Sequence, residues 1–260
     1  GAEPIAHDTI DRFAEAFAPS GFRREAFFPA YGMAEYTLLI SLKREGVAPT
    51  LLPLDPSALE RGVVSEATVG VVPVRQVVGC GAPVGDTRVV IAHPETLSRC
   101  AARQVGEIWL AGASTTQGYW NNPEETARTF GATLRDTGEG PFLRTGDLGF
   151  VRDGEVFVTG RLKDLLIVRG RNHYPQDIER TVEQSHRLFR GGGAAAFSVQ
   201  DAGEEAVVVV QEVERQATAL AIDEPATAIR SAVSEQHDLH VFTIIFIKAG
   251  SLPRTSSGKV

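Results

Sequence analysis

The stretch FLRTGDLGFVRDGEVFVTGRLKDLLIVRGRNHYPQDIE, residues 142–179, decides the fold class of this chain. Two short apolar runs, 148–152 and 155–158, flank Asp153-Gly154, which favours a tight hairpin turn because both positions tolerate positive φ. Beyond Gly160 the pattern predicts strand, helix, strand, strand, helix and strand. The expected elements are 165–168, 175–186, 194–199, 206–213, 225–239 and 241–247. The segment therefore joins a β-rich region to a compact α+β unit.

Upstream of the hairpin, further short apolar runs at 87–91 and 107–110 predict a small β-barrel or twisted sheet. Asn122-Pro123-Glu124-Glu125 supplies a cap, a first-turn proline and a glutamate, so a helix should begin there with Phe130 on its inner side.

The beginning of the chain predicts one amphipathic helix over 8–17, with Asp8 as its N-cap and Pro19-Ser20-Gly21 as its stop. Residues 43–75 have poor periodicity and are interpreted as an insertion or long loop. The α+β chain should thus divide into residues 1–160 and 161–260, with the boundary in 160–163.

Composition narrows the class of protein. A chain of 260 residues with 43% hydrophobic content can bury a substantial core. Lys and Arg number 26 against 33 Asp and Glu, a net charge of −7 that argues against a nucleic-acid partner. The two cysteines, Cys80 and Cys100, are interpreted as packing residues and not as a disulfide. Free cysteines fit a protein of a reducing compartment. No apolar run is long enough to span a membrane, so a cytoplasmic protein is expected. Because Gly1 comes first and Met33 is the lone methionine, we expect a fragment, a processed form or a chain that lacks its natural start.

Several polar residues are candidates for a site. Asp147, between two glycines in TGDLG, can accept hydrogen bonds from a vicinal diol; the alternative is a turn in which it bonds its own backbone. In YGMAE, Tyr31 offers a flat partner for a base and Glu35 an oxygen ligand for a hard cation, although Tyr31 could equally be core. In GRLKD, Arg161 can donate to sugar oxygens, whereas Lys163 and its acidic neighbour could form a plain surface pair.

The last motif, LPRTSSGK, ends on Lys259. It is not a phosphate-binding P-loop, because Pro253 stands where that motif needs glycine and Val260 where it needs Ser or Thr. The alternative is a frayed tail. The aromatic pair Tyr119 and Trp120 in GASTTQGYW is interpreted as packing, and the glycines 191–193 as a flexible loop before a strand.

Four histidines lie on or beside predicted helices. Those at 173, 186, 237 and 240 show no spacing typical of a zinc site, and no catalytic Ser, His and Asp set is evident. His173 belongs to the stretch RGRNHYP and is the histidine of most interest.

YGMAE, GASTTQGYW, TGDLG, GRLKD and the terminal lysine motif occur in an order that resembles the adenylate-forming enzymes. The stretch RGRNHYPQDIE is similar to the fatty acyl-AMP ligases of that superfamily. The resemblance implies the C-terminal part of a large adenylation domain, with a β-barrel subdomain and adjoining α/β elements, followed by a small mobile α+β domain. In the large domain, residues 43–75 would match a family insertion that disfavours CoA chemistry.

The resemblance also implies roles. Tyr31 would pack on adenine, Asp147 and Arg161 would bind ribose, and Glu35 would help to hold Mg²⁺. Lys163 would be the hinge, within 161–164, and Lys259 the catalytic cation. The complete enzyme would use ATP and Mg²⁺ to convert a fatty acid to acyl-AMP and then pass the acyl group to an acyl carrier protein.

Two alternatives remain. One is an acyl-CoA synthetase or the adenylation domain of a peptide synthetase; the other is a non-catalytic fragment that binds an adenylate or a carrier. Relatives carry a phosphate-binding loop upstream of the tyrosine motif, and no such segment precedes Tyr31 here. We therefore expect residues 1–260 alone to be weak or inactive in adenylation.

Overall fold

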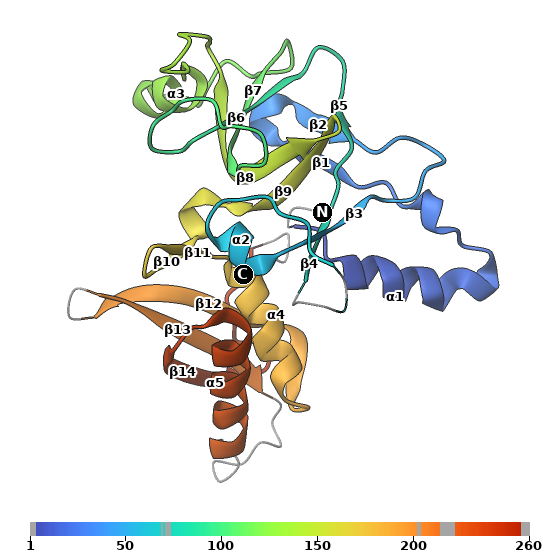
Figure 1. Ribbon diagram of the computed structural model, residues 1–260, viewed down its shortest axis with the longest axis vertical. Coiled ribbons are helices and arrows are strands. Elements are labelled where there is room, and N and C mark those ends of the chain that lie inside the picture. The colour runs from blue at the N-terminus through green and yellow to red at the C-terminus, as the bar shows by residue number, and fades with distance from the viewer. Residues whose placement is uncertain (1–3, 69, 71–73, 202–203, 214–221, 256–260) are drawn as a thin grey trace. The chain divides into compact units, whose positions relative to one another are not determined.

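A computed structural model describes residues 4–68, 70, 74–201, 204–213 and 222–255 (Figure 1). The chain divides into two compact units, with the boundary between Lys163 and Asp164. Since the placement of one unit relative to the other is not determined, each is described by itself.

The first unit begins with helix α1, His7–Phe17. Its N-cap is Ala6, which has no capping side chain, so the prediction that Asp8 caps the helix is wrong. Asp8 lies instead in the first turn, where a negative charge is favourable near the positive end of the helix dipole. The helix ends as predicted, through a 3₁₀ turn at Ala18–Ser20 and a left-handed Gly21.

Strands dominate the rest of the first unit. They are β1 (Ala30–Met33), β2 (Leu38–Leu42), β3 (Leu51–Leu54), β4 (Arg75–Val78), β5 (Ala82–Pro83), β6 (Arg88–Ala92), β7 (Gly106–Ala111), β8 (Leu143–Arg152) and β9 (Glu155–Arg161). The sheet β6-β7-β8-β9 is an antiparallel meander, beside a β1-β2-β5 sheet and a β3-β4 pair. On the other edge of β9, the backbone N–H of Cys80 donates to the Val156 oxygen at 2.8 Å, and the Val156 N–H donates to the Gly81 oxygen at 2.9 Å. The polar edge of β9 is therefore paired by the segment that leads into β5.

The hairpin and the helix predicted for this unit are confirmed. Asp153 and Gly154 have φ of 50° and 78°, the mirror-image turn that joins β8 to β9. Helix α3, Pro123–Phe130, is capped by Asn122, whose Oδ1 accepts a hydrogen bond from the backbone N–H of Glu125 at 3.2 Å.

The expectation that 43–75 forms a loop is wrong in part, because the segment contains β3 and helix α2, Pro56–Glu60. Asp55 caps α2 by accepting from the backbone N–H of Ser57 at 2.9 Å. Leu54 and Leu59 are each 1% exposed. Poor periodicity here reflects short elements that alternate quickly, since a four-residue strand and a five-residue helix do not repeat long enough to show a period.

The second unit has the predicted α+β order. Its elements are β10 (Leu166–Val168), β11 (Arg171–His173), α4 (Pro175–Ser185), β12 (Phe189–Asp201), β13 (Glu204–Val213), α5 (Asp223–His237) and β14 (Val241–Lys248). β13 pairs antiparallel with β12 and parallel with β14, and α4 packs against β12 and α5. Ile178, Val182, Val209 and Ile229 form the centre of the core and are fully buried.

Two local features of this unit differ from the prediction. The short strand β11 was not predicted; it pairs with β10 across Arg169 and Gly170, both with positive φ. The glycines 191–193 lie inside β12, where the register shifts between Phe189 and Ala194, and not in a loop before it. Glycine is common at such bulges because it tolerates the local distortion.

Candidate functional site

Three residues predicted to bind a nucleotide lie together in the first unit. The Tyr31 hydroxyl donates a hydrogen bond to Asp147 Oδ2 at 2.7 Å, and Arg161 Nε donates to Asp147 Oδ1 at 3.1 Å. Asp147 and Arg161 are directly paired across β8 and β9, so their side chains leave the same face of the sheet. The fold thus assembles one polar cluster from β1, β8 and β9.

Tyr31 is largely buried. It is 8% exposed and packs with Tyr36 and Ile40. Burial, and then the negative charge of Asp147, raise the pKa of Tyr31 well above its ordinary value, so its hydroxyl remains a donor. In this structure Tyr31 is both a core residue and a polar partner of Asp147; its stacking on adenine stays a prediction.

Asp147 retains capacity for further ligands. Each of its two oxygens accepts one hydrogen bond from a side chain, and a carboxylate offers about four lone-pair sites. The Arg161 side chain is 48% exposed, so the cluster has a face toward solvent. The arrangement can therefore receive two hydroxyl donors, as a vicinal diol would present.

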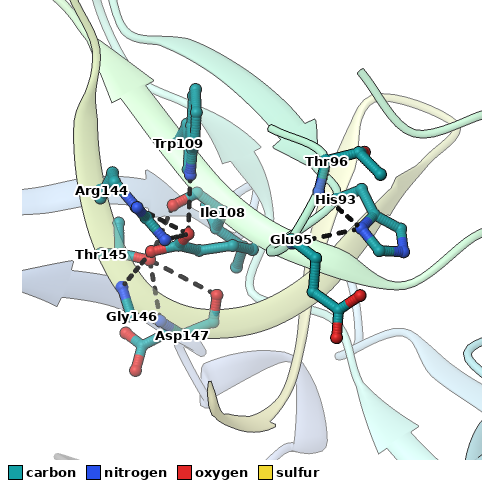
Figure 2. Close-up of polar contacts among 10 residues, drawn as sticks. His93, Glu95, Thr96, Ile108, Trp109, Arg144, Thr145, Gly146 and Asp147 are labelled. Atoms are coloured by element: carbon teal, nitrogen blue, oxygen red, sulfur yellow. Dashed lines mark hydrogen bonds and ion pairs between the residues drawn. The ribbon is translucent and has the colours of Figure 1, made fainter. Parts of the chain in front are cut away.

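The part of β8 that carries Asp147 is fixed by its neighbours (Figure 2). Thr145 Oγ1 donates to the carbonyl oxygen of Ile108 at 2.7 Å and accepts from the backbone N–H of Asp147 at 3.0 Å. Gly146 has a φ of +69°, which a residue with a side chain rarely adopts. Asp147 does use its backbone in a local bond, but its carboxylate points to Tyr31 and Arg161.

Sequence reasoning missed Glu107 on β7, which is only 2% exposed. Its Oε2 accepts from Arg144 (Nη2 2.7 Å, Nε 3.0 Å) and from Trp109 Nε1 (2.9 Å), and its Oε1 accepts from the backbone N–H of Gly146 at 3.1 Å. This carboxylate connects β7 to the stretch of β8 directly before Asp147. A lone acidic residue inside the apolar run GEIWLA was the available signal, because a buried charge needs partners.

Glu35, the predicted magnesium ligand, lies in a 3₁₀ turn at Ala34–Tyr36. Its Oε1 accepts from the hydroxyl of Tyr119 at 2.8 Å. Burial, followed by the Glu35 carboxylate, raises the pKa of Tyr119 to about 12. In the part of the chain that the structure describes, no group of three or more His, Cys, Asp or Glu could hold a metal. One carboxylate nevertheless suits Mg²⁺, which keeps waters and binds substrate phosphates.

The interpretation of Tyr119 and Trp120 as a packing pair needs correction. Trp120 is 91% exposed. Tyr119 does pack, edge to face on Phe130 with ring centroids 5.4 Å apart, but its hydroxyl also binds Glu35.

The remaining predicted residues are separate from the cluster. Lys163 lies in the 3₁₀ turn Leu162–Asp164 at the boundary of the units. Lys259 lies outside the described residues. Cys80 and Cys100 are free thiols, as predicted. His173 is 3% exposed, and its burial, together with the neighbouring His237 and Arg171, lowers its pKa to about 4.

Comparisons with known proteins show what the chain as a whole is similar to. A model described as AMP-binding enzyme matches residues 1–120, and one described as Disco-interacting protein 2-like, AMP domain, matches residues 163–260. The chain is similar over its whole length to the medium-chain-fatty-acid–acyl-carrier-protein ligase JamA of Moorena producens, with 53% identity. It is 39% identical to the long-chain-fatty-acid–AMP ligase FadD26 of Mycobacterium tuberculosis.

A solved structure from work on fatty acyl-adenylate ligases of E. coli and L. pneumophila superposes on all of this chain with a TM-score of 0.86 and 32% identity. The chain covers 44% of that structure's chain, 44% of JamA and 45% of FadD26, so it spans less than half the length of these relatives. No helix among the described residues is long and apolar enough to cross a membrane.

Family models match residues in both units, and both relatives match the chain throughout. The chain is therefore similar, in both of its units, to AMP-binding enzymes.

Proposed function

We propose that the protein carrying this chain is a fatty acyl-AMP ligase. A carboxylate oxygen of the fatty acid would attack the α-phosphorus of ATP, the bond to the β-phosphate oxygen would break, and pyrophosphate would leave. The phosphopantetheine thiol of a carrier protein would then attack the acyl carbonyl, lose its proton and displace AMP. The name of JamA supports the carrier as acceptor, and that of FadD26 supports the acyl adenylate.

The convergence of Tyr31, Arg161 and Asp147 is the observation that carries this proposal. Asp147 would accept both ribose hydroxyls, and Arg161 would donate to a ribose oxygen. Tyr31 would hold the Asp147 carboxylate in place beside the base. These roles require no movement of the backbone, because β8 and β9 already fix the pair.

The remaining residues would serve the reacting phosphates. Glu35 has one carboxylate oxygen outside its contact with Tyr119 that could bind Mg²⁺, which when bound would neutralise phosphate charge. Lys259 would bring a cation to the α-phosphate as charge develops. Rotation near Lys163 would separate adenylation from acyl transfer. A cytoplasmic location would suit these substrates.

The first test uses the protein as its gene encodes it. It is incubated with ATP, Mg²⁺ and fatty acids of several lengths, with or without CoA or a phosphopantetheinylated carrier, and the products are identified by mass spectrometry. Acyl-AMP and acyl-carrier without acyl-CoA is the expected result. Acyl-CoA would identify a synthetase, amino-acyl adenylate a peptide-synthetase domain, and nucleotide binding without product a non-catalytic protein.

The second test is Asp147→Asn, which keeps the size of the side chain but removes its charge and one acceptor. Charge-assisted hydrogen bonds are worth about 1.5–3 kcal/mol each, so we expect the KM for ATP to rise by about 10- to 100-fold. Asp153→Asn in the hairpin turn is the matched control, since its side chain is 89% exposed. Equal KM values for both variants would contradict the role of Asp147.

A further inference from the structure

The segment 112–119 lies along Glu35, the predicted magnesium ligand. Thr116 N–H donates to the backbone oxygen of Glu35 at 2.9 Å, and Thr37 Oγ1 donates to the oxygen of Ser114 at 2.7 Å. Tyr119 then closes the contact from the side chain, with its hydroxyl 2.8 Å from Glu35 Oε1. Glu35 is therefore held at its backbone and at its carboxylate by one segment.

Tyr119 is itself held firmly against helix α3. Its backbone N–H donates to Thr126 Oγ1 at 2.9 Å, and its ring packs at 74° on Phe130. Gly118 has a φ of +130°, and a Cβ there would lie 2.2 Å from Thr126 Cγ2. Backbone and ring are thus both fixed, so the hydroxyl is presented at a defined position.

A hydrogen bond to one oxygen of a carboxylate limits the rotation of the whole group. A free glutamate side chain loses rotamer entropy when it is ordered. If the glutamate is already ordered before a cation arrives, cation binding does not have to offset this loss of entropy. The second oxygen, Oε2, is then directed by the bond made to Oε1.

We propose that Tyr119 is a positioning residue, which orients Glu35 so that its free oxygen meets the cation of the nucleotide-metal complex. This inference rests on the proposed function, because it requires Glu35 to serve a nucleotide-bound cation. It adds a residue and a segment to the site, and gives the GYW stretch a role beyond packing.

The variant Tyr119→Phe removes only the hydroxyl and keeps the ring on Phe130. Mn²⁺ replaces Mg²⁺ as the probe, and bound Mn²⁺ is counted by electron paramagnetic resonance with a non-hydrolysable ATP analogue present. We expect the Mn²⁺ dissociation constant to rise by about tenfold in Tyr119→Phe and further in Glu35→Gln. Trp120→Phe, next in the chain and exposed, is the control and should bind as the wild type does.

Kinetics separate positioning from a purely structural effect. In Tyr119→Phe the Mg²⁺ concentration for half-maximal acyl-AMP formation should rise by a similar factor, while kcat at saturating Mg²⁺ and the melting temperature stay near wild type. Unchanged Mn²⁺ affinity in Tyr119→Phe, with affinity lost in Glu35→Gln, would overturn the role of Tyr119 and leave the proposed function intact. Unchanged affinity in both variants, or no nucleotide-dependent Mn²⁺ binding in the wild type, would overturn the inference with the role of Glu35. Failure of the proposed function is read separately, from the absence of acyl-AMP in the wild type.

Discussion

Replacing Glu107 by glutamine is the sharpest test of how the candidate site is supported. The carboxylate has two oxygens and accepts from four N–H groups, which belong to Arg144, Trp109 and Gly146. Glutamine keeps one acceptor oxygen and turns an NH₂ group toward donors that it cannot satisfy. The change is nearly isosteric, so it tests charge and hydrogen bonding and leaves packing almost unchanged.

The expected loss of stability follows from these contacts. Breaking a buried ion pair costs about 3–5 kcal/mol, and each hydrogen bond to a charged group is worth about 1.5–3 kcal/mol. The Arg144 side chain is 26% exposed, so water can recover part of its loss. We therefore expect Glu107→Gln to lower the free energy of unfolding of the first unit by about 3 kcal/mol. With a urea dependence of about 2 kcal/mol per M, the midpoint should fall by about 1.5 M.

The assay uses the two tryptophans of the chain. Trp109 is fully buried beside Glu107, whereas Trp120 is 91% exposed. In a Trp120→Phe background, fluorescence during urea unfolding reports only on the first unit. Glu139→Gln is the matched control, because Glu139 also binds two arginines at 2.7 Å but lies at the surface. We expect Glu139→Gln to lower the free energy of unfolding by less than about 1 kcal/mol.

A Glu107→Gln midpoint that moves no more than that of Glu139→Gln would refute this reasoning. It would mean that the carboxylate at 107 is not a charged acceptor for these donors. The nucleotide affinity of Glu107→Gln is a second measurement. It should fall, because the loss of the hydrogen bond to Gly146 should also displace Asp147.

Two further predictions concern pH and backbone packing. The pKa of His173 falls from 6.5 unfolded to about 4 folded, so stability is complete above pH 6.5 and is lost as pH falls toward 4, by up to about 3 kcal/mol. In thermal melts from pH 7 to 4.5, the melting temperature should fall less steeply in His173→Asn than in the wild type, and as steeply as in the wild type in the exposed variant His240→Asn. Equal pH slopes for the two variants would refute this prediction. At Gly32, a Cβ would lie 1.8 Å from the backbone oxygen of Leu38, so Gly32→Ala should force β1 from β2 and destabilise by about 3 kcal/mol in urea unfolding. Gly191→Ala, whose Cβ meets only an oxygen at 3.9 Å, is the control, and equal midpoints would contradict the clash.

Sequence reasoning succeeded where local chemistry determines structure. Asp153-Gly154 supplies two residues that tolerate positive φ, and Asn122 supplies a side-chain acceptor for α3, so both elements could be predicted from a few residues. Candidate site residues were also found from short motifs, and the structure brings Tyr31 and Asp147 into contact although they are 116 residues apart.

The failures share one physical cause, which is that tertiary contacts decide the outcome. Asp8 has the chemistry of a cap, but α1 begins before it. Trp120 is a large aromatic residue of the kind often found in a core, yet its side chain faces solvent. The next residue, Asn121, has a φ of 51°. Glu107 reads as one polar residue in a strand, and its importance depends on Arg144, which follows 37 residues later.

The pairing of Asp147 with Arg161 also affects the order in which the site can form during folding. These residues are 14 positions apart on one hairpin, whereas Tyr31 must close a loop of 116 residues to reach the same carboxylate. Loop-closure entropy makes the distant contact more costly by about 2 kcal/mol. Hairpins close within microseconds, so the acidic and basic partners can meet while the rest of the first unit is still unfolded. If the hairpin forms first, the phenol joins a charge pair that already exists, and the aspartate is not buried alone.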